Sequence, residues 1–209
     1  IACTLSDLRS GNGFESPVKN VRIIAGAFKG RALAAVGKGD AGAHLRPTTD
    51  RVRENLFNIL TGGRFDVDLD GARVLDLFAG TGALGLEALS RGAAHVTFVD
   101  TGRKSLDLIR QNIAICGAQR QSNILKCDAM RLPKNPEVPY DLVFLDPPYK
   151  KGMGERAISL ALSGGWIAPD ALIIWEEGQD ITPPPELQII DTRKYGDSRA
   201  YFVTRADHP

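Results

Sequence analysis

The sequence predicts an α/β fold built on a mainly parallel β-sheet, and three observations support this prediction. From residue 73 onward, short apolar segments alternate with segments of helical periodicity. A glycine-rich turn separates the first apolar segment from the first helix. The chain then ends in two strand-like segments joined by a Gly-Asp turn, which favours an antiparallel hairpin at the sheet edge. Such alternation is typical of βαβ units with both faces of the sheet covered.

The length and composition predict one main core with a smaller extension. The chain has 209 residues, and we expect a flexible N-terminus over residues 1–17, a basic hairpin and helix over residues 18–62, and the sheet domain over residues 63–209. No apolar run reaches the roughly 20 residues of a membrane-spanning helix. Three cysteines without metal-like spacing indicate a reducing compartment. We therefore expect a cytoplasmic monomer without a metal site.

The N-terminal extension predicts a hairpin, a connector and one helix. Residues 21–34 alternate basic and apolar side chains with interrupting glycines, which favours a hairpin. A glycine-rich connector follows at 36–44. Thr49 or Asp50 can cap the helix that comes next. Its apolar residues recur at helical spacing and are Val52, Leu56, Ile59 and Leu60.

Basic residues are concentrated in this extension, although the net charge is only +1. Between Val18 and Arg53, eight basic residues oppose two acidic ones, which indicates a polyanionic partner, with a solvated basic surface as the alternative. Arg51 and Arg53 cannot share one helix face, so at most one points at a cleft. The basic residues that we expect to bind this partner are Arg22, Lys29, Arg31 and Arg46. The first three, in the hairpin, are the better candidates for phosphate contacts.

The sheet domain can be divided into strands and helices in chain order. The predicted elements are RVLDLF, a helix near 83–91, HVTFVD, a helix near 102–116 closed by Gly117, NILKC, DLVFLD, a helix near 153–163, ALIIWEE, and the terminal pair LQIIDTRKYGDSRAYFVT. No internal repeat interrupts this series.

The glycine-rich turn in VLDLFAGTGALG is the first chemical motif. Gly80, Gly82 and Gly85 match G-x-G-x-x-G, and Asp100 follows about 20 residues later, as in a dinucleotide fingerprint. Asp76, at the end of the preceding strand, would repel a pyrophosphate. S-adenosylmethionine instead carries a sulfonium and an ammonium. The acid therefore favours S-adenosylmethionine over a nicotinamide dinucleotide as the cofactor.

Two further acids follow strands of the same predicted sheet. Asp100 can accept hydrogen bonds from the ribose hydroxyls, and Asp128 follows the third strand, beside the expected position of the adenine. The alternatives are that the glycines only allow tight packing and that Asp76 and Asp128 cap helices or turns. The residues that we expect to bind the cofactor are Asp76, Phe78, Gly80, Gly82, Asp100, Asp128 and Ala129.

The segment DLVFLDPPY is the second chemical motif. Two prolines end the strand, because neither can donate to a sheet ladder. Asp146 and the carbonyl of Pro147 can hold the N–H bonds of an exocyclic amine and direct its lone pair at a methyl group. Pro148 stiffens the turn, and Tyr149 offers a face on which a flipped base can stack. We therefore expect Asp146, Pro147 and Tyr149 to be catalytic and Pro148 and Tyr149 to contact the base.

With these motifs the chain resembles the class I S-adenosylmethionine-dependent methyltransferases, and more closely the bacterial 16S rRNA guanine-N2 methyltransferases of the RsmD type. The segments that carry the resemblance are RIIAGAFKGR, LRPTTDRVRENLFNIL, VLDLFAGTGALGLEALSRGA and VFLDPPY. It implies a Rossmann-like seven-stranded sheet with an antiparallel last strand, and methyl transfer to the N2 amine of a guanine in small-subunit rRNA, in an assembled or partly assembled subunit. Residues 1–17 have no counterpart in the family pattern.

Three other functions compete with this reading. A DNA adenine-N6 methyltransferase uses the same amine clamp but normally carries an extra base-reading domain, for which this chain has no room. An NAD-dependent oxidoreductase would share the glycine loop, but Asp76 and DPPY oppose it. A non-catalytic nucleic-acid-binding module would keep the fold, but it would not need Asp146 or the glycine loop.

Overall fold

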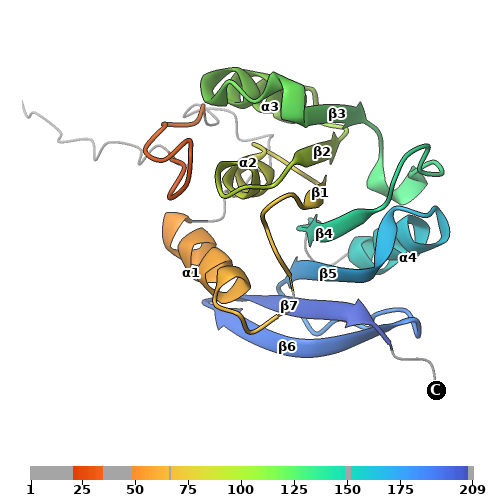
Figure 1. The fold of residues 1–209 in the computed structure, drawn as a ribbon. Coiled ribbons are helices and arrows are strands. Elements are labelled where there is room, and N and C mark those ends of the chain that lie inside the picture. Colours follow the sequence, from red (N-terminus) through yellow and green to blue (C-terminus); the bar gives the residue numbers. More distant parts are fainter. Residues whose placement is uncertain (1–20, 35–48, 66, 149–151, 207–209) are drawn as a thin grey trace, which may run out of the picture.

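The computed structural model describes residues 21–34, 49–65, 67–148 and 152–206. It contains a seven-stranded sheet in the order β3-β2-β1-β4-β5-β7-β6 (Figure 1), and the predicted α/β fold is confirmed. The strands are β1 (Arg73–Leu77), β2 (His95–Asp100), β3 (Ser122–Lys126), β4 (Tyr140–Leu145), β5 (Ile167–Glu177), β6 (Leu187–Tyr195) and β7 (Ser198–Arg205). The helices are α1 (Asp50–Thr61), α2 (Ala83–Ser90), α3 (Arg103–Cys116), α4 (Met153–Ser163) and the short 3₁₀ turns η1 (Gln119–Gln121) and η2 (Ala129–Arg131).

Strands β1 to β5 pair in parallel, so their carboxyl ends meet at one edge of the sheet. The last strand, β7, lies between β5 and β6 and is antiparallel to both, which confirms the predicted terminal hairpin. Glu177, the last residue of β5, lies opposite Arg199 near the start of β7. The turn between β6 and β7 therefore also lies at the edge where the parallel strands end. We call this edge the carboxyl edge.

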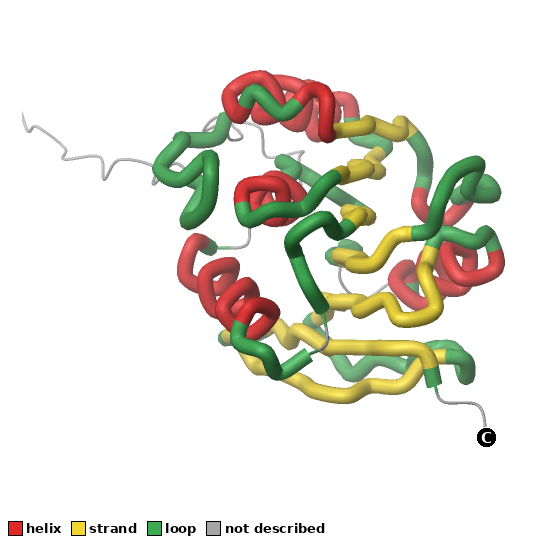
Figure 2. Tube along the Cα trace, in the orientation of Figure 1, coloured by secondary structure: helices red, strands yellow, loops and turns green. Residues whose placement is uncertain are grey.

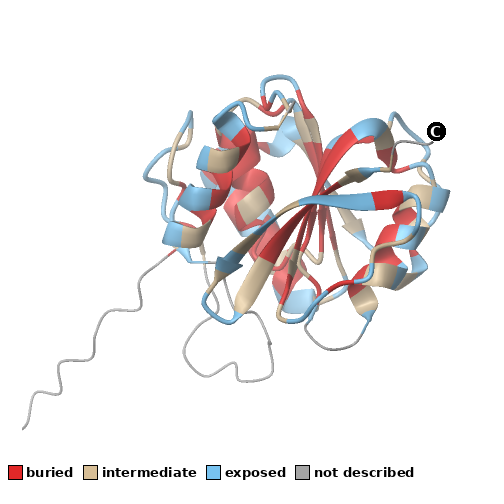
Figure 3. Ribbon diagram, turned by 90° about the horizontal axis from the view of Figure 1, so that it is seen from below, coloured by how far each residue is buried: buried red, intermediate tan, exposed pale blue. Residues whose placement is uncertain are grey.

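The inner strands β1, β2 and β4 alternate side chains between two buried faces, which is why their sequences are mostly apolar. Val74, Phe144 and Ile174 belong to the face covered by α1, α2 and α3, which we call the three-helix face. Leu145 and Trp175 belong to the opposite face, covered by α4. Figure 2 shows helices on both sides of the strands, and Figure 3 shows the buried residues gathered along the central strands.

Helix α1 packs on the three-helix face and begins where the sequence predicted. The Thr49 hydroxyl accepts a hydrogen bond from the Val52 N–H at 3.4 Å, which caps the helix. The Phe57 ring lies 5.8 Å from the ring of Phe144, and the guanidinium of Arg91, the residue after α2, lies over the Phe57 ring at 4.9 Å from its centre. The buried residues of the helix are Arg53, Leu56, Phe57 and Leu60.

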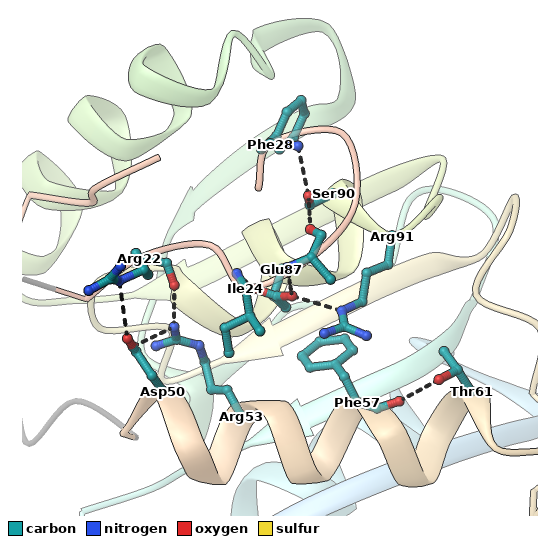
Figure 4. A network of polar contacts seen from close by, with 11 residues as sticks. Arg22, Ile24, Phe28, Asp50, Arg53, Phe57, Thr61, Glu87, Ser90 and Arg91 are labelled. Atoms are coloured by element: carbon teal, nitrogen blue, oxygen red, sulfur yellow. Dashed lines mark hydrogen bonds and ion pairs between the residues drawn. The ribbon is translucent and has the colours of Figure 1, made fainter. Parts of the chain in front are cut away.

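The N-terminal hairpin, closed by an antiparallel bridge between Arg22 and Ala32, is held on helix α2 by a fully buried acid, Glu87. Glu87 accepts hydrogen bonds from the backbone N–H groups of Ile24 at 2.8 Å and Ala25 at 3.1 Å. It also accepts one from the Arg91 Nε at 2.7 Å (Figure 4). A buried carboxylate is tolerated when several donors surround it, as they do here. Because two of these donors belong to the N-terminal hairpin, Glu87 ties the hairpin to the sheet domain.

Replacing Glu87 with glutamine is expected to lower the free energy of unfolding by about 2 kcal/mol, because the amide NH₂ would face other donors and leave a backbone N–H unsatisfied. Urea unfolding followed by circular dichroism measures the change. The matched control is Glu54→Gln on the exposed side of α1, where we expect a change below about 0.5 kcal/mol. Equal stability of the two variants would contradict the anchoring role of Glu87.

Candidate active site

The loop between β1 and α2 has an unusual backbone at the carboxyl edge. Phe78, Gly80 and Gly82 all have positive φ angles, at 60°, 57° and 74°. Glycine adopts this region without strain, whereas Phe78 occupies it at a cost that marks a constrained turn. Gly85 serves packing instead, because a Cβ there would lie 2.5 Å from Cε1 of Phe98. The turn thus allows the backbone of this loop to approach a ligand bound at the carboxyl end of β1.

Asp100, at the end of β2, fixes this loop. Its Oδ2 accepts from the Gly80 N–H at 2.9 Å, and its Oδ1 accepts from the Gly102 N–H at 2.7 Å. Each carboxylate oxygen has a second lone pair, so both remain able to accept from another donor such as a ribose hydroxyl. Asp100 is half-buried and therefore reachable from the carboxyl edge.

Asp76 lies deeper, at 3% exposure, in the middle of the sheet. Its Oδ2 accepts from the Gly85 N–H at 3.1 Å, so it caps the first turn of α2. Burial raises the pKa of Asp76 to about 8, and this outweighs the lowering by the Gly85 hydrogen bond, while the charge of Asp100 adds to the rise. A cation beside Asp76 would offset the cost of ionising it, so the site fits a positively charged cofactor better than an anionic one.

Asp128 and Ala129 follow β3 at the same edge. The Asp128 Oδ1 accepts from the Met130 N–H at 2.9 Å and caps η2. The side chain of Ala129 is buried in the core on the α4 side of the sheet, so only its backbone can face a ligand. Turn formation accounts for the geometry of Asp128, and its role toward an adenine stays a prediction.

The end of β4 carries the second motif. The Asp146 N–H makes the last contact of the ladder, donating to the Leu77 carbonyl at 3.5 Å. Asp146 is half-buried, Pro147 is buried and Pro148 is exposed, whereas Tyr149 lies outside the described residues. Burial, together with the charges of Glu176, Asp76 and Glu177, raises the pKa of Asp146 well above its usual range. The carboxyl group is thus partly shielded from water and lies among other acids.

Strand register explains why acids gather here. Val74, Phe144 and Ile174 point to the three-helix face, so the residues two positions later, Asp76, Asp146 and Glu176, are directed to the same face. The strands that carry them, β1, β4 and β5, are neighbours. Sequence reasoning missed Glu176, although its position directly after the apolar run of β5 was a signal of the same kind as that of Asp146.

The predicted phosphate-binding residues lie on the surface of the N-terminal hairpin. Arg22, Lys29 and Arg31 are exposed. Arg22 approaches Asp50 at 3.8 Å, and Arg31 donates to the Ile115 carbonyl at 2.8 Å. Arg46 lies outside the described residues.

Arg53 is fully buried and acts within the fold rather than at a cleft. Its guanidinium donates to the Arg22 carbonyl and to Asp50 (Figure 4). Burial lowers its pKa, and the charges of Asp50 and Glu87 oppose that effect. Arg51 is exposed, so of these two arginines only Arg51 is available to a substrate.

The described residues contain no group of three or more histidine, cysteine, aspartate or glutamate side chains arranged to hold a metal. Within the same residues, no helix is long and apolar enough to cross a membrane.

Comparison with known proteins identifies a family and relatives that match most of this chain. The family profile described as Conserved hypothetical protein 95 matches residues 21–204. Ribosomal RNA small subunit methyltransferase D of Escherichia coli is 41% identical over 156 residues, covering 75% of this chain and 74% of that protein. Its namesake in Haemophilus influenzae is 39% identical over 170 residues, covering 78% and 83%.

A solved structure, that of the yhhF protein of Escherichia coli, superposes with a TM-score of 0.76 at 36% identity and covers 90% of this chain and 99% of that chain. The sheet order, the antiparallel seventh strand and the helices on both faces are those of the class I methyltransferase fold. The chain therefore belongs to the family described as Conserved hypothetical protein 95, the RsmD-type methyltransferases that its sequence resembles.

Proposed function

We propose that this protein transfers a methyl group from S-adenosylmethionine to the exocyclic N2 amine of a guanine in small-subunit ribosomal RNA, within an assembled or partly assembled subunit. The observation that carries the proposal is the position of Asp146 and Pro147 at the end of β4, directly beside the strand that ends in the glycine loop. The names of the Escherichia coli and Haemophilus influenzae relatives support ribosomal RNA as the substrate.

The residues around the glycine loop fit the cofactor. When bound, S-adenosylmethionine supplies an activated methyl group on a cationic sulfur. Asp76 would hold its positive charge, and the tight turn at Gly80 and Gly82 would let backbone N–H groups and Asp100 approach it. We assign Phe78, Asp128 and Ala129 to the rim of the same site. The buried position of Asp76 favours this cationic group over the pyrophosphate of a nicotinamide dinucleotide.

Asp146 and Pro147 provide the chemistry for the acceptor. An exocyclic amine is a poor nucleophile because its lone pair is delocalised into the ring. The Asp146 carboxylate and the Pro147 carbonyl would accept its two N–H bonds and aim the lone pair. Once the nitrogen has gained a fourth bond, Asp146 can take the proton, and its raised pKa favours holding it. We assign base stacking to Tyr149 and contact with the turn to Pro148.

A radiolabelled methyl-transfer assay tests the function. Purified protein is incubated with labelled S-adenosylmethionine and with naked 16S rRNA, immature small subunits from cells lacking the protein, or DNA containing adenine. We expect label in the subunits, in N2-methylguanine at one mapped position. Label in N6-methyladenine of DNA would replace the proposal with the adenine alternative, and no label in any substrate would reject it.

The exposed lysine of the N-terminal hairpin should contribute to RNA affinity. Replacing Lys29 with alanine is expected to weaken binding to subunits and to reduce the slope of log K against log salt by about one, because one phosphate contact is lost. Filter binding from low to physiological salt measures both. Lys134→Ala, exposed in the loop before β4, is the matched control, and an equal effect of the two substitutions would contradict a specific role of the hairpin.

A further inference from the structure

A second acid stands beside the amine-holding residue. In the pairing of β4 and β5, Leu145 lies opposite Trp175. The next residues along these strands, Asp146 and Glu176, are therefore neighbours, about 5 Å apart at the backbone. Both are half-buried and both are directed to the three-helix face, because Phe144 and Ile174, two residues earlier, belong to its core.

The terminal hairpin holds Glu176 in place. The Ser198 hydroxyl donates to the Glu176 Oε1 at 2.9 Å, from the first residue of β7. The strand pairing places Glu176 opposite Ala200, so its backbone is fixed on that side as well. The neighbouring acid, Glu177, is directed to the other face with Trp175 and accepts from the Gly178 N–H at 2.7 Å. Of Glu176 and Glu177, only Glu176 is directed to the same face of the sheet as Asp146.

The atom next to the reacting amine differs among the nucleobases. In guanine the N2 amine adjoins N1, which carries a hydrogen. In adenine the N6 amine adjoins N1, and in cytosine the N4 amine adjoins N3, and both of these ring nitrogens are acceptors. An ionised carboxylate can only accept hydrogen bonds. A carboxylate beside Asp146 and Pro147 would therefore bind the N1–H of guanine and repel the acceptor nitrogens of adenine and cytosine.

We propose that Glu176 is a specificity-determining residue, whose carboxylate accepts the N1–H of the target guanine while Asp146 and the Pro147 carbonyl hold the N2 amine. This inference rests on the proposed function and deepens it by naming the group that distinguishes guanine from adenine. Ser198 acts as a positioning residue, since it reaches the base only through Glu176.

The electrostatics of the site agree with this assignment. After burial, the charge of Glu176 raises the pKa of Asp146 more than the charge of Asp76 or of Glu177 does. Two carboxyl groups side by side in a partly dry site repel each other unless donors lie between them. The guanine edge presents three N–H hydrogens in a row, two on N2 and one on N1, and so supplies donors to both acids.

The test compares two bases at the position mapped by the methyl-transfer assay. Small subunits are reconstituted with rRNA that carries guanine or 2-aminopurine there. 2-Aminopurine keeps the 2-amine but presents an acceptor at N1. The measured quantity is the ratio of kcat/KM for guanine over 2-aminopurine, in the wild type, Glu176→Gln and the matched control Glu177→Gln. A misfolded fraction lowers both rates equally and leaves this ratio unchanged, and the missing O6 of 2-aminopurine affects all three enzymes alike.

We expect a ratio of about 10² or more for the wild type and for Glu177→Gln, and a fall of at least about tenfold for Glu176→Gln, whose amide can also donate. If the wild type methylates guanine and Glu176→Gln keeps the full ratio, the role of Glu176 is refuted and the proposed function stands. If the wild type methylates neither base, the proposed function is refuted and this inference with it.

Discussion

Replacing Asp146 with alanine is expected to lower the turnover of methyl transfer by about 10³-fold, because the amine then loses the carboxylate that holds its N–H bond and takes its proton. The affinity for S-adenosylmethionine is expected to stay within about threefold of the wild type, since the glycine loop that we propose binds it is held by Asp100 and Asp76. The backbone bond from Asp146 to Leu77 does not depend on the side chain.

The same substitution should not weaken the fold at neutral pH. The folded-state pKa of Asp146 is raised above its unfolded value. The unfolded chain therefore loses this proton at lower pH than the folded chain, and stability falls as pH rises between the two pKa values. Alanine removes that penalty, so we expect the free energy of unfolding at pH 7 to equal or exceed that of the wild type.

Single-turnover assays and calorimetric titration with the cofactor separate these effects. Asp170→Ala, at an exposed position in the same strand as Glu176, is the matched control and should keep wild-type turnover. Retention of more than about a tenth of the turnover by Asp146→Ala would show that another group holds the amine. A large loss of cofactor affinity would place Asp146 in the cofactor site instead.

The elements and both chemical motifs could be predicted because each depends on neighbours in sequence. The strand, glycine turn and helix around Gly80 are one local unit, and Asp146 follows its strand directly. The terminal hairpin could be predicted for the same reason, because its two strands are joined by a short turn between Tyr195 and Ser198. Its insertion, with β7 inside and β6 at the edge, depends instead on pairing with β5, which the local pattern does not specify.

The contacts that place charged groups inside the protein could not be predicted. Glu87 looks like an ordinary helix residue, yet its partners Ile24 and Ala25 lie more than 60 positions earlier in the chain. Arg53 belongs to a basic block that indicates a surface, but in the interior its charge is compensated by the carbonyl of Arg22 and by the charges of Asp50 and Glu87. Periodicity describes which side of an element is apolar, and it does not show which buried position carries a compensated charge.

The affinity for S-adenosylmethionine is expected to rise about 50-fold between pH 6 and pH 8, with Asp76 as the cause. The pKa of Asp76 is about 8 in the cofactor-free protein, so the carboxyl is mostly neutral at pH 6 and half ionised at pH 8. A bound cation favours the ionised form, and binding below pH 8 must therefore release a proton. Binding then weakens by about fivefold from pH 8 to pH 7 and by about ninefold from pH 7 to pH 6.

The substitution Asp76→Asn should remove this dependence. Its amide oxygen can still accept from the Gly85 N–H, so the cap of α2 is kept, but no negative charge can form. We expect the variant to bind the cofactor weakly and almost equally at pH 6 and pH 8. Its free energy of unfolding should exceed that of the wild type increasingly as pH rises toward 8, because the unfolded wild type gains free energy by ionising Asp76 while the folded wild type still holds the proton.

Calorimetric titrations at pH 6, 7 and 8, in two buffers of different ionisation enthalpy, measure both the affinity and the released proton. The ammonium group of the cofactor also titrates in this range, and Asp76→Asn reports that contribution separately, because it retains the ligand's titration and lacks the protein's. If Asp76 only caps α2, the variant will match the wild type in affinity and in slope. If affinity depends steeply on pH only in the wild type, the Asp76 carboxylate binds the cationic cofactor. The positive charge of the bound cofactor then compensates the cost of an ionised acid buried in the sheet.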